Sequence, residues 1–175
     1  AAVEAKVNYI DICDDYEAAE ILFASDIDNA ARAAGITVLT GMGSDPGTNN
    51  VIVKWFANKL DRVDEIALFW VVSIAELAGA AWDHRLHMTI GKIPQYLDGR
   101  LEHVEGGTGV ETATFLEPLG ACQVCYVGHP QPLTIPRYIK GVKRVVIKGA
   151  LIPGWVDQLI KEQKDTGFLS KEPLD

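Results

Sequence analysis

Acidic, histidine and arginine side chains that could bind a substrate or carry protons are concentrated at three places in the chain. In chain order these are Asp14 with Asp15, Asp45 in a glycine-rich turn, and His84 with Arg85. Histidine changes charge near neutral pH, so His84 could serve as a polar contact or a proton carrier. The planar guanidinium of Arg85 could bind a carboxylate through two parallel hydrogen bonds. Each place also has a structural interpretation, as a helix cap for the aspartates and a helix surface for the arginine.

Metal binding and thiol chemistry are both disfavoured by the sequence. His84 and His87 could share a helix face, but no carboxylate or cysteine stands at a convincing third position, so we expect no metal site. Cys122 and Cys125 have the Cys-x-x-Cys spacing, but they lie in a β-rich run in which a spacing of three sends the side chains to opposite faces. Together with Cys13 we expect reduced, mostly buried thiols of a cytosolic protein.

The turn at Thr40–Asn50 contains three glycines within seven positions, between an apolar strand-like run and a helical run. Asp45 and Pro46 are expected to begin the helix, the first as a side-chain cap. The spacing is close to the Gly-x-Gly-x-x-Gly motif of dinucleotide-binding folds, but Pro46 occupies the position of the third glycine. We therefore interpret this turn as a glycine cluster that caps a helix and lines a site, with no phosphate cradle.

The elements that position these residues can be read from the hydrophobic pattern. A strand, a helix and a second strand over 7–12, 14–34 and 36–40 predict a parallel crossover unit. A helix over about 46–60 and a mixed stretch over 75–97 are expected, and three prolines break the chain around Thr134. Further strands are expected over 65–72, 100–104, 111–115, 121–127 and 143–148, and a last helix from Pro153 to about Lys164. This order predicts an α/β (α+β) protein in which a parallel unit precedes a larger mixed sheet.

Size and charge limit the class of partner. The chain has 175 residues, is 48% hydrophobic and has a formal charge of -8 with no basic stripe, which argues against nucleic acid. Its apolar runs are too short to span a bilayer, so no membrane contact is expected. A small metabolite is the expected partner.

Several segments of the chain resemble the saccharopine dehydrogenase family. The most specific is Ala34–Val38 followed by Gly43–Gly47, a strand and a glycine-rich turn that ends Asp-Pro-Gly. The other matching segments are Tyr9–Asp11, Phe115–Gly120, Tyr126–His129 and Leu133–Arg137, and a Trp-x-x-Arg stretch ends at Arg85. The chain departs from the family in two respects. It lacks the first strand and the glycine fingerprint of the cofactor half, and Gln131 stands where a glutamate usually follows His129.

The resemblance implies a fold, an activity and a set of site residues. Residues 1–43 are expected to be the end of a Rossmann-type dinucleotide-binding domain, and residues 44–175 a substrate-binding and dimerisation domain resembling the C-terminal domain of glyceraldehyde-3-phosphate dehydrogenase. The implied activity is NAD(P)-dependent oxidation at the CH–NH group of an amino-acid-derived amine, by a cytoplasmic homodimer. Implied substrate contacts are Arg85, His84, Asp14, Asp45 and Gly47, and implied cofactor contacts are Asp11 and Gly43.

Because the cofactor half is missing, we expect this chain alone to be inactive and to bind NAD or NADP weakly. The proton-transfer group stays unassigned. The alternative is a non-catalytic α/β domain that binds a ligand or dimerises and keeps only the fold.

Overall fold

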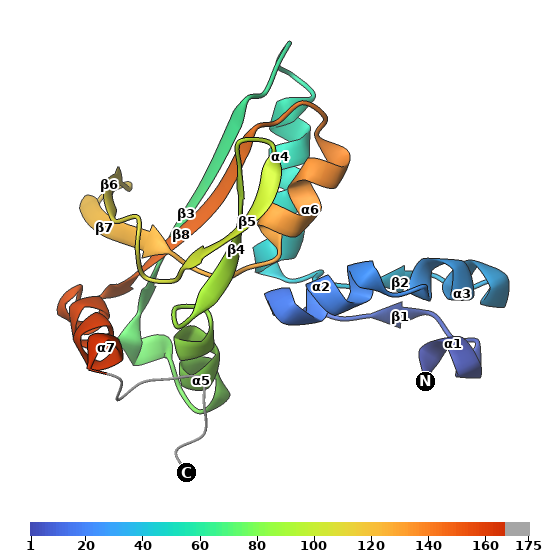
Figure 1. Cartoon of the computed structure of the whole chain (residues 1–175), viewed down its shortest axis with the longest axis horizontal. Helices are drawn as coiled ribbons and strands as arrows, with labels where there is room; N and C mark the ends of the chain where they lie inside the picture. Colours follow the sequence, from blue (N-terminus) through green and yellow to red (C-terminus); the bar gives the residue numbers. More distant parts are fainter. Residues whose placement is uncertain (167–175) are drawn as a thin grey trace.

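The computed structural model describes residues 1–166, which form an elongated N-terminal unit attached to a larger body (Figure 1). The N-terminal unit is defined here as residues 1–43 and contains two parallel strands, β1 (Tyr9–Ile10) and β2 (Val38–Leu39). Its helices are α1 (Ala2–Ala5), α2 (Tyr16–Ala24) and α3 (Ile27–Ala34). The parallel strand, helix, strand order predicted for the first 40 residues is therefore present.

The body, residues 44–166, is built on one mixed six-stranded sheet. Its strands are β3 (Glu65–Ser73), β4 (Lys92–Leu97), β5 (Arg100–Glu105), β6 (Glu111–Thr114), β7 (Ala121–Tyr126) and β8 (Arg144–Ile152). Strand β8 is central: β3 pairs with it in parallel along nine residues, whereas β4 pairs antiparallel near its start, at Val145, and β7 antiparallel at its middle, at 148–149. Hairpins then add β5 to β4 and β6 to β7.

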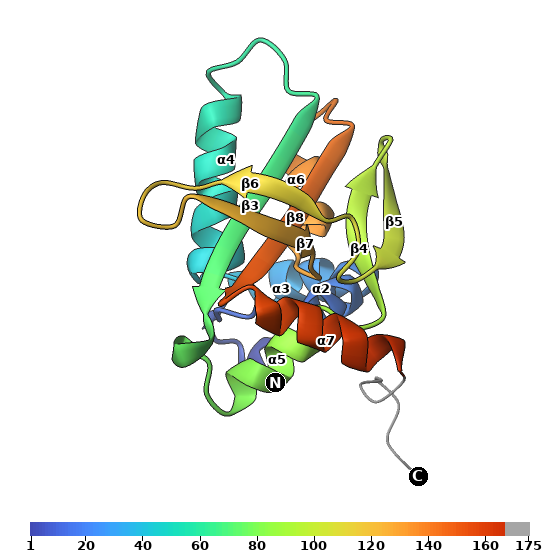
Figure 2. The same cartoon turned by 90° about the vertical axis from the view of Figure 1, so that its left-hand side faces the viewer.

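Helices cover the sheet in two groups (Figure 2). Two helices lie along β3 and β8: α4 (Asn49–Ala57) and α6 (Gln131–Tyr138). The helical turn η1 (Ser44–Thr48) comes directly before α4. The core that α4 and α6 share is centred on Ile135, Ile139 and Val145. Two other helices, α5 (Ala80–His87) and α7 (Trp155–Asp165), meet at the other end of β8 around Leu151. The short 3-10 turn η2 (Ile74–Glu76) comes before α5. Within the described residues, no helix is long and apolar enough to cross a membrane.

A buried amide joins the strands where β4 and β7 diverge from β8. Gln95 is fully buried on β4, and its Nε2 donates to the carbonyl of Val127 at 3.0 Å. Its Oε1 accepts from the N–H of Ile147, also at 3.0 Å. The side chain thus replaces ladder hydrogen bonds that the diverging strands cannot make, and it satisfies buried main-chain groups that would otherwise be unpaired. This bridge fixes the start of the 127–130 segment, which enters the candidate site.

Four expectations from the sequence need correction. The helix expected over 14–34 is two helices, because Ser25 ends the first by donating from Oγ to the carbonyl of Leu22, and Asp26 begins the second. The stretch 75–97, expected to be mixed, contains strand β4, and the stretch around Thr134, expected to be broken by prolines, contains helix α6. Pro132 stands in the first turn of α6, where a missing N–H costs little. Finally, Cys13 is exposed and Cys122 half-buried, so only Cys125 is a buried thiol as expected.

Candidate functional site

Several of the predicted site residues come together where the N-terminal unit meets the body. The loops after β1 and β2 start from the same edge of the small sheet because the strands are parallel. The first loop brings Asp14 and the second brings Asp45. Helix α5 contributes His84, and the segment after β7 contributes His129. The four side chains form two carboxylate–imidazole pairs, Asp14 with His84 and Asp45 with His129.

The pair of Asp14 and His84 is only partly buried. Asp14 Oδ1 lies 3.2 Å from His84 Nε2. The hydrogen bond that protonated His84 donates to the Asp14 carboxylate raises the pKa of His84 above its ordinary value, although burial acts in the opposite direction. Burial raises the pKa of Asp14, but the hydrogen bond and the positive charge of His84 outweigh it, so the pKa of that carboxyl lies below its ordinary value. His84 is therefore suited to hold a proton near neutral pH and to release it to a bound molecule.

The pair of Asp45 and His129 is more deeply buried. His129 is 3% exposed, and its Nδ1 lies 3.8 Å from Asp45 Oδ2, which is beyond hydrogen-bond distance. Burial lowers the pKa of His129 and raises the pKa of Asp45, and the attraction between the two charged forms opposes both shifts. The ring of His129 lies 6.4 Å from that of His84 and 6.0 Å from that of Trp70. The two imidazoles thus lie edge to face, and their pKa values shift in opposite directions.

Polar atoms of His129, of its neighbours Asp45 and Trp70, and of Gln131 two residues along the chain are buried without hydrogen-bond partners. They are Asp45 Oδ1, His129 Nδ1, Trp70 Nε1 and both amide atoms of Gln131. An unpaired buried polar atom lowers the free energy of unfolding by about 1–3 kcal/mol, and native proteins keep such atoms mainly where a ligand or ordered water supplies the missing hydrogen bond. Trp70 and Gln131 were missed as site residues in the sequence. The departure of Gln131 from the family pattern was the one signal that could have pointed to it.

Asp11 has a structural role in the turn. Its Oδ1 accepts hydrogen bonds at 2.9 Å from the N–H groups of Cys13 and Gly41, which ties the loop after β1 to the turn after β2. Burial raises the pKa of Asp11, but these two hydrogen bonds outweigh burial and hold the pKa below its ordinary value. This use of the carboxylate leaves that oxygen unavailable to a cofactor.

The glycines of the turn allow main chain to pack on main chain. A Cβ on Gly47 would lie 2.7 Å from the carbonyl oxygen of Gly41 and 2.8 Å from the carbonyl carbon of Met42. A Cβ on Gly43 would lie 3.4 Å from Ile12. These contacts fill the inside of the turn, so it offers no open cradle for a phosphate. Asp45 has extended backbone at the kink before α4, its Oδ1 has no partner, and its side chain bonds to Asn49 at the start of that helix, so it caps through a side chain and not through a main-chain N–H as expected.

Arg85 lies in the interior, with its guanidinium carbon 5.4 Å from the centre of the Trp70 ring, the same ring that neighbours His129. It is 2% exposed, its Nη2 donates to Asp157 Oδ1 at 2.7 Å, and its Nη1 bonds to Thr89 Oγ1. Neighbouring residues on a helix point about 100° apart. His84 and Arg85 therefore have different surroundings. A substrate carboxylate could reach this guanidinium only if the pair with Asp157 opened, so substrate binding by Arg85 stays a prediction.

His87 extends the cluster toward α2. Its Nε2 lies 3.4 Å from Asp15 Oδ2, and its ring stacks on that of Tyr16 with centroids 5.2 Å apart. Asp15 also accepts from the N–H of Ala18 at 2.9 Å, as the capping interpretation predicted. Among residues 1–166, no group of three or more histidine, cysteine or acidic side chains has the geometry to hold a metal.

No protein-family model matches this chain, and no curated protein matches it either. The chemistry assigned to the site therefore depends on its own side chains. They provide an acidic surface at Asp14 and Asp45, a proton carrier at His84, and buried hydrogen-bonding atoms around His129. Such a set suits a small polar ligand that carries a positive charge, with a proton exchanged at His84.

Proposed function

We propose that the chain is the substrate-binding and dimerisation part of an NAD(P)-dependent oxidoreductase similar to the saccharopine dehydrogenases. Its substrate would be an amino-acid-derived amine oxidised at the CH–NH group. The observation that carries the proposal is the meeting of Asp14, His84, Asp45 and His129 beside buried polar atoms that have no partners. In this proposal the carboxylates attract the protonated amine, and the neutral form of His84 accepts the N–H proton that the amine must lose before hydride leaves its carbon.

The nicotinamide would supply hydride transfer when bound, but the residues of this chain do not fit it. The turn at 41–47 is filled by its own main chain, and Oδ1 of Asp11 is engaged by Cys13 and Gly41. The proposed cofactor contacts at Asp11 and Gly43 are thus weakened, and the cofactor would be held by residues outside this chain. The further proposal of a body resembling the C-terminal domain of glyceraldehyde-3-phosphate dehydrogenase is supported by the mixed sheet with helices on its faces.

A reassembled enzyme tests the proposal. Joining a Gly-x-Gly-x-x-Gly cofactor unit upstream should give NAD(P)-dependent oxidation of saccharopine, lysine or a carboxylated polyamine. His84→Gln in that enzyme should then lower kcat by roughly 100-fold, the lower end of what one general acid–base group contributes. Arg32→Gln, which removes an exposed ion pair with Asp28 far from the site, is the matched control. The chain alone should show no nanomolar NAD or NADP binding by calorimetry. Activity on none of the amines, or full activity of His84→Gln, would contradict the proposal.

Dimerisation with a second copy is supported by an apolar surface over α4 and β3. Ile52, Trp55 and Phe56 of α4 are 46%, 56% and 56% exposed. In the described part of the chain, β3 has a strand on one side only, so its other side offers nine residues of unpaired main chain. Antiparallel pairing of two β3 strands about a two-fold axis would cover this edge and the neighbouring helix face together.

Light scattering after gel filtration tests the dimer. We expect twice the chain mass of 19.1 kDa. Trp55→Glu with Phe56→Glu should yield the monomer, because charge cannot be buried at such an interface without a partner. Leu116→Glu is the control, since Leu116 is 89% exposed in the β6–β7 loop. A wild-type monomer, or a dimer that tolerates both glutamates, would refute the assignment of this surface.

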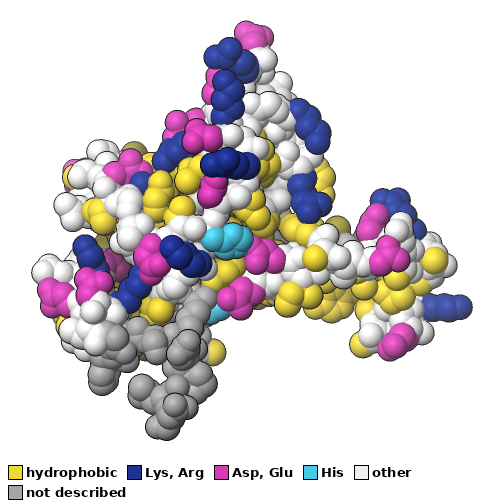
Figure 3. Space-filling model, viewed as in Figure 1, with side chains coloured by type: hydrophobic (Ala, Val, Ile, Leu, Met, Phe, Trp, Pro, Cys, Tyr) yellow, Lys and Arg dark blue, Asp and Glu magenta, His cyan; other side chains and the backbone are white. Residues whose placement is uncertain are grey.

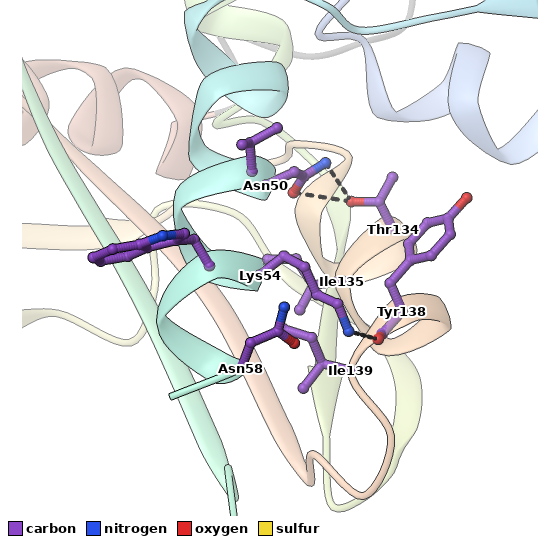
Figure 4. Close-up of a pocket in the computed structure, with 9 residues that line it drawn as sticks. Asn50, Lys54, Asn58, Thr134, Ile135, Tyr138 and Ile139 are labelled. Atoms are coloured by element: carbon purple, nitrogen blue, oxygen red, sulfur yellow. Dashed lines mark hydrogen bonds between the residues drawn. The ribbon is translucent and has the colours of Figure 1, made fainter. Parts of the chain in front are cut away.

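The alternative, a non-catalytic ligand-binding or dimerisation domain, is supported by a cavity of about 420 Å³ between α4 and α6. Figure 4 shows Asn50 bonded to Thr134 at one end and Lys54 reaching the carbonyl of Tyr138 at the other, at 3.1 and 2.8 Å. Ile135 and Ile139 also line it, so it suits a small, mainly apolar ligand. This alternative predicts that the reassembled protein binds such a ligand and oxidises none of the amines.

A further inference from the structure

The cavity between α4 and α6 is lined by one stripe of each helix. Residues 51, 54, 55 and 58, on α4 and its C-cap, recur at the spacing that places side chains on one helix face, and residues 134, 135, 138 and 139 of α6 also line it. Ile135 and Ile139 are buried and give the cavity an apolar floor. Lys54 is the only charged side chain among the described residues that line it. The cavity thus combines an apolar surface with one positive charge.

We propose that this cavity binds a small carboxylate with an apolar body. Lys54 binds the carboxylate group, and the hydrocarbon part packs against Ile135 and Ile139. None of the four residues of the carboxylate–imidazole pairs lines the cavity, so this is a second site. The proposal goes beyond amine oxidation and specifies the ligand of the alternative function. It needs no nicotinamide, so this chain by itself can test it.

Lys54 keeps hydrogen-bonding capacity for a ligand. An ammonium group has three N–H donors, and the structure uses one of them, to the carbonyl of Tyr138 at 2.8 Å (Figure 4). That bond places Nζ between the two helices, at one end of the cavity. Asn58 and Ile139 lie at the same end, and the Asn58 amide can donate a further hydrogen bond to the same carboxylate.

The segments that form the cavity are positively charged, in a chain whose formal charge is -8. Segments 49–60 and 131–143 contain no acid and five cations: Lys54, Lys59, Arg137, Lys140 and Lys143. Lys59 lies over the ring of Trp55, a lining residue, with Nζ 4.3 Å from the ring centre. Figure 3 shows Lys and Arg side chains on the outer surface around α4 and α6. This local field attracts an anion to the cavity.

The position and size of the cavity favour a short carboxylate over a phosphate or a long lipid. Lys54 lies near the C-terminal ends of α4 and α6, where the last carbonyls carry partial negative charge. A doubly charged phosphate would meet more of this repulsion than a singly charged carboxylate. The volume of about 420 Å³ lies toward the lower end of the range for small-molecule sites.

Calorimetric titration of the whole chain with octanoate at neutral pH provides the test. Octanol, which has the same hydrocarbon chain and no charge, is the matched probe. We expect octanoate to bind roughly tenfold more tightly than octanol, because a hydrogen bond to a charged group is stronger than one between neutral groups. Octyl phosphate should bind more weakly than octanoate.

Substitutions at Lys54 identify the group that binds the carboxylate. Lys54→Gln should lower the affinity for octanoate roughly tenfold and leave that for octanol unchanged, whereas Lys54→Arg should keep the preference for octanoate. Lys92→Gln, which removes an exposed lysine of β4, is the control and should bind as the wild type does. If Lys54→Gln fails to fold because the Tyr138 carbonyl loses its donor, Asn58→Asp keeps that bond and should weaken octanoate binding alone.

Three results would overturn the proposal. They are octanoate binding no more tightly than octanol, octyl phosphate binding more tightly than octanoate, and octanoate affinity unchanged in the folded Lys54→Gln or Asn58→Asp variant. A reassembled enzyme that oxidises none of the amines would contradict the oxidoreductase proposal and leave these binding results as they stand.

Discussion

Replacing Arg85 by methionine should lower the free energy of unfolding by about 3–5 kcal/mol, the largest effect we expect from a single side chain. The guanidinium is 2% exposed, and its partner Asp157 is held in place by the N–H of Leu151, which donates to Oδ2 at 2.6 Å. Removing the cation leaves Asp157 with an unpaired negative charge beside the core of α7. Urea unfolding, followed by tryptophan fluorescence, measures the loss.

A second substitution tests whether the loss of stability comes from the charge of Asp157 without its partner. Asp157→Asn in the Arg85→Met background should restore part of the stability, because a neutral amide costs less to bury than an unpaired carboxylate. If Arg85→Met unfolds with wild-type stability, the pair is not a structural element. In a reassembled enzyme, Arg85→Lys tests the other role: a raised substrate KM would support substrate contact, and an unchanged KM would remove Arg85 from the site.

Replacing Gly47 by alanine should destabilise the chain by about 1–3 kcal/mol and displace Asp45 from His129. The new Cβ would lie 2.7–2.9 Å from main-chain atoms of Gly41 and Met42, which cannot rotate away as a side chain can. The turn must therefore open, and Asp45 is two residues from the point of strain. Thermal unfolding measures the stability, and loss of activity in a reassembled enzyme measures the displacement.

Gly154→Ala is the matched control for this prediction. Gly154 has φ -59° and ψ -16°, which alanine adopts freely, and a Cβ there meets no atom within 4 Å. The same chemical change should thus be neutral or slightly stabilising at this position. An equal loss of stability in both variants would show that the packing inside the turn is unimportant.

Local sequence patterns predicted the elements that contact segments close to them in the sequence. The crossover unit was predicted because Gly35 ends a helix between two apolar runs, and β5, β6 and β7 were predicted because turns separate β-rich runs. Strand β4 was missed because its residues Lys92–Leu97 contain Pro94 and Gln95, which are unusual in a central strand. Only the fold shows that the Gln95 amide bridges two diverging strands.

The sequence predicted some members of the site but neither Trp70 nor Gln131, and it did not predict the roles. Asp14, Asp45 and His84 were selected for their chemistry and do lie in one cluster. Arg85 was selected with them, but one step along a helix places it in the interior beside Asp157. That partner lies 72 residues away in the sequence, so no local pattern could reveal it.

The central position of β8 also determines when the sheet can form during synthesis. Strands β3, β4 and β7 all pair with β8, and the register joins Glu65 to Arg144 and Ser73 to Ile152. A ribosome must therefore release residue 152 before the apolar faces of the earlier strands can be covered. Until then α4 and β3 are exposed as they leave the tunnel, which gives chaperones that bind apolar segments a defined interval in which to act.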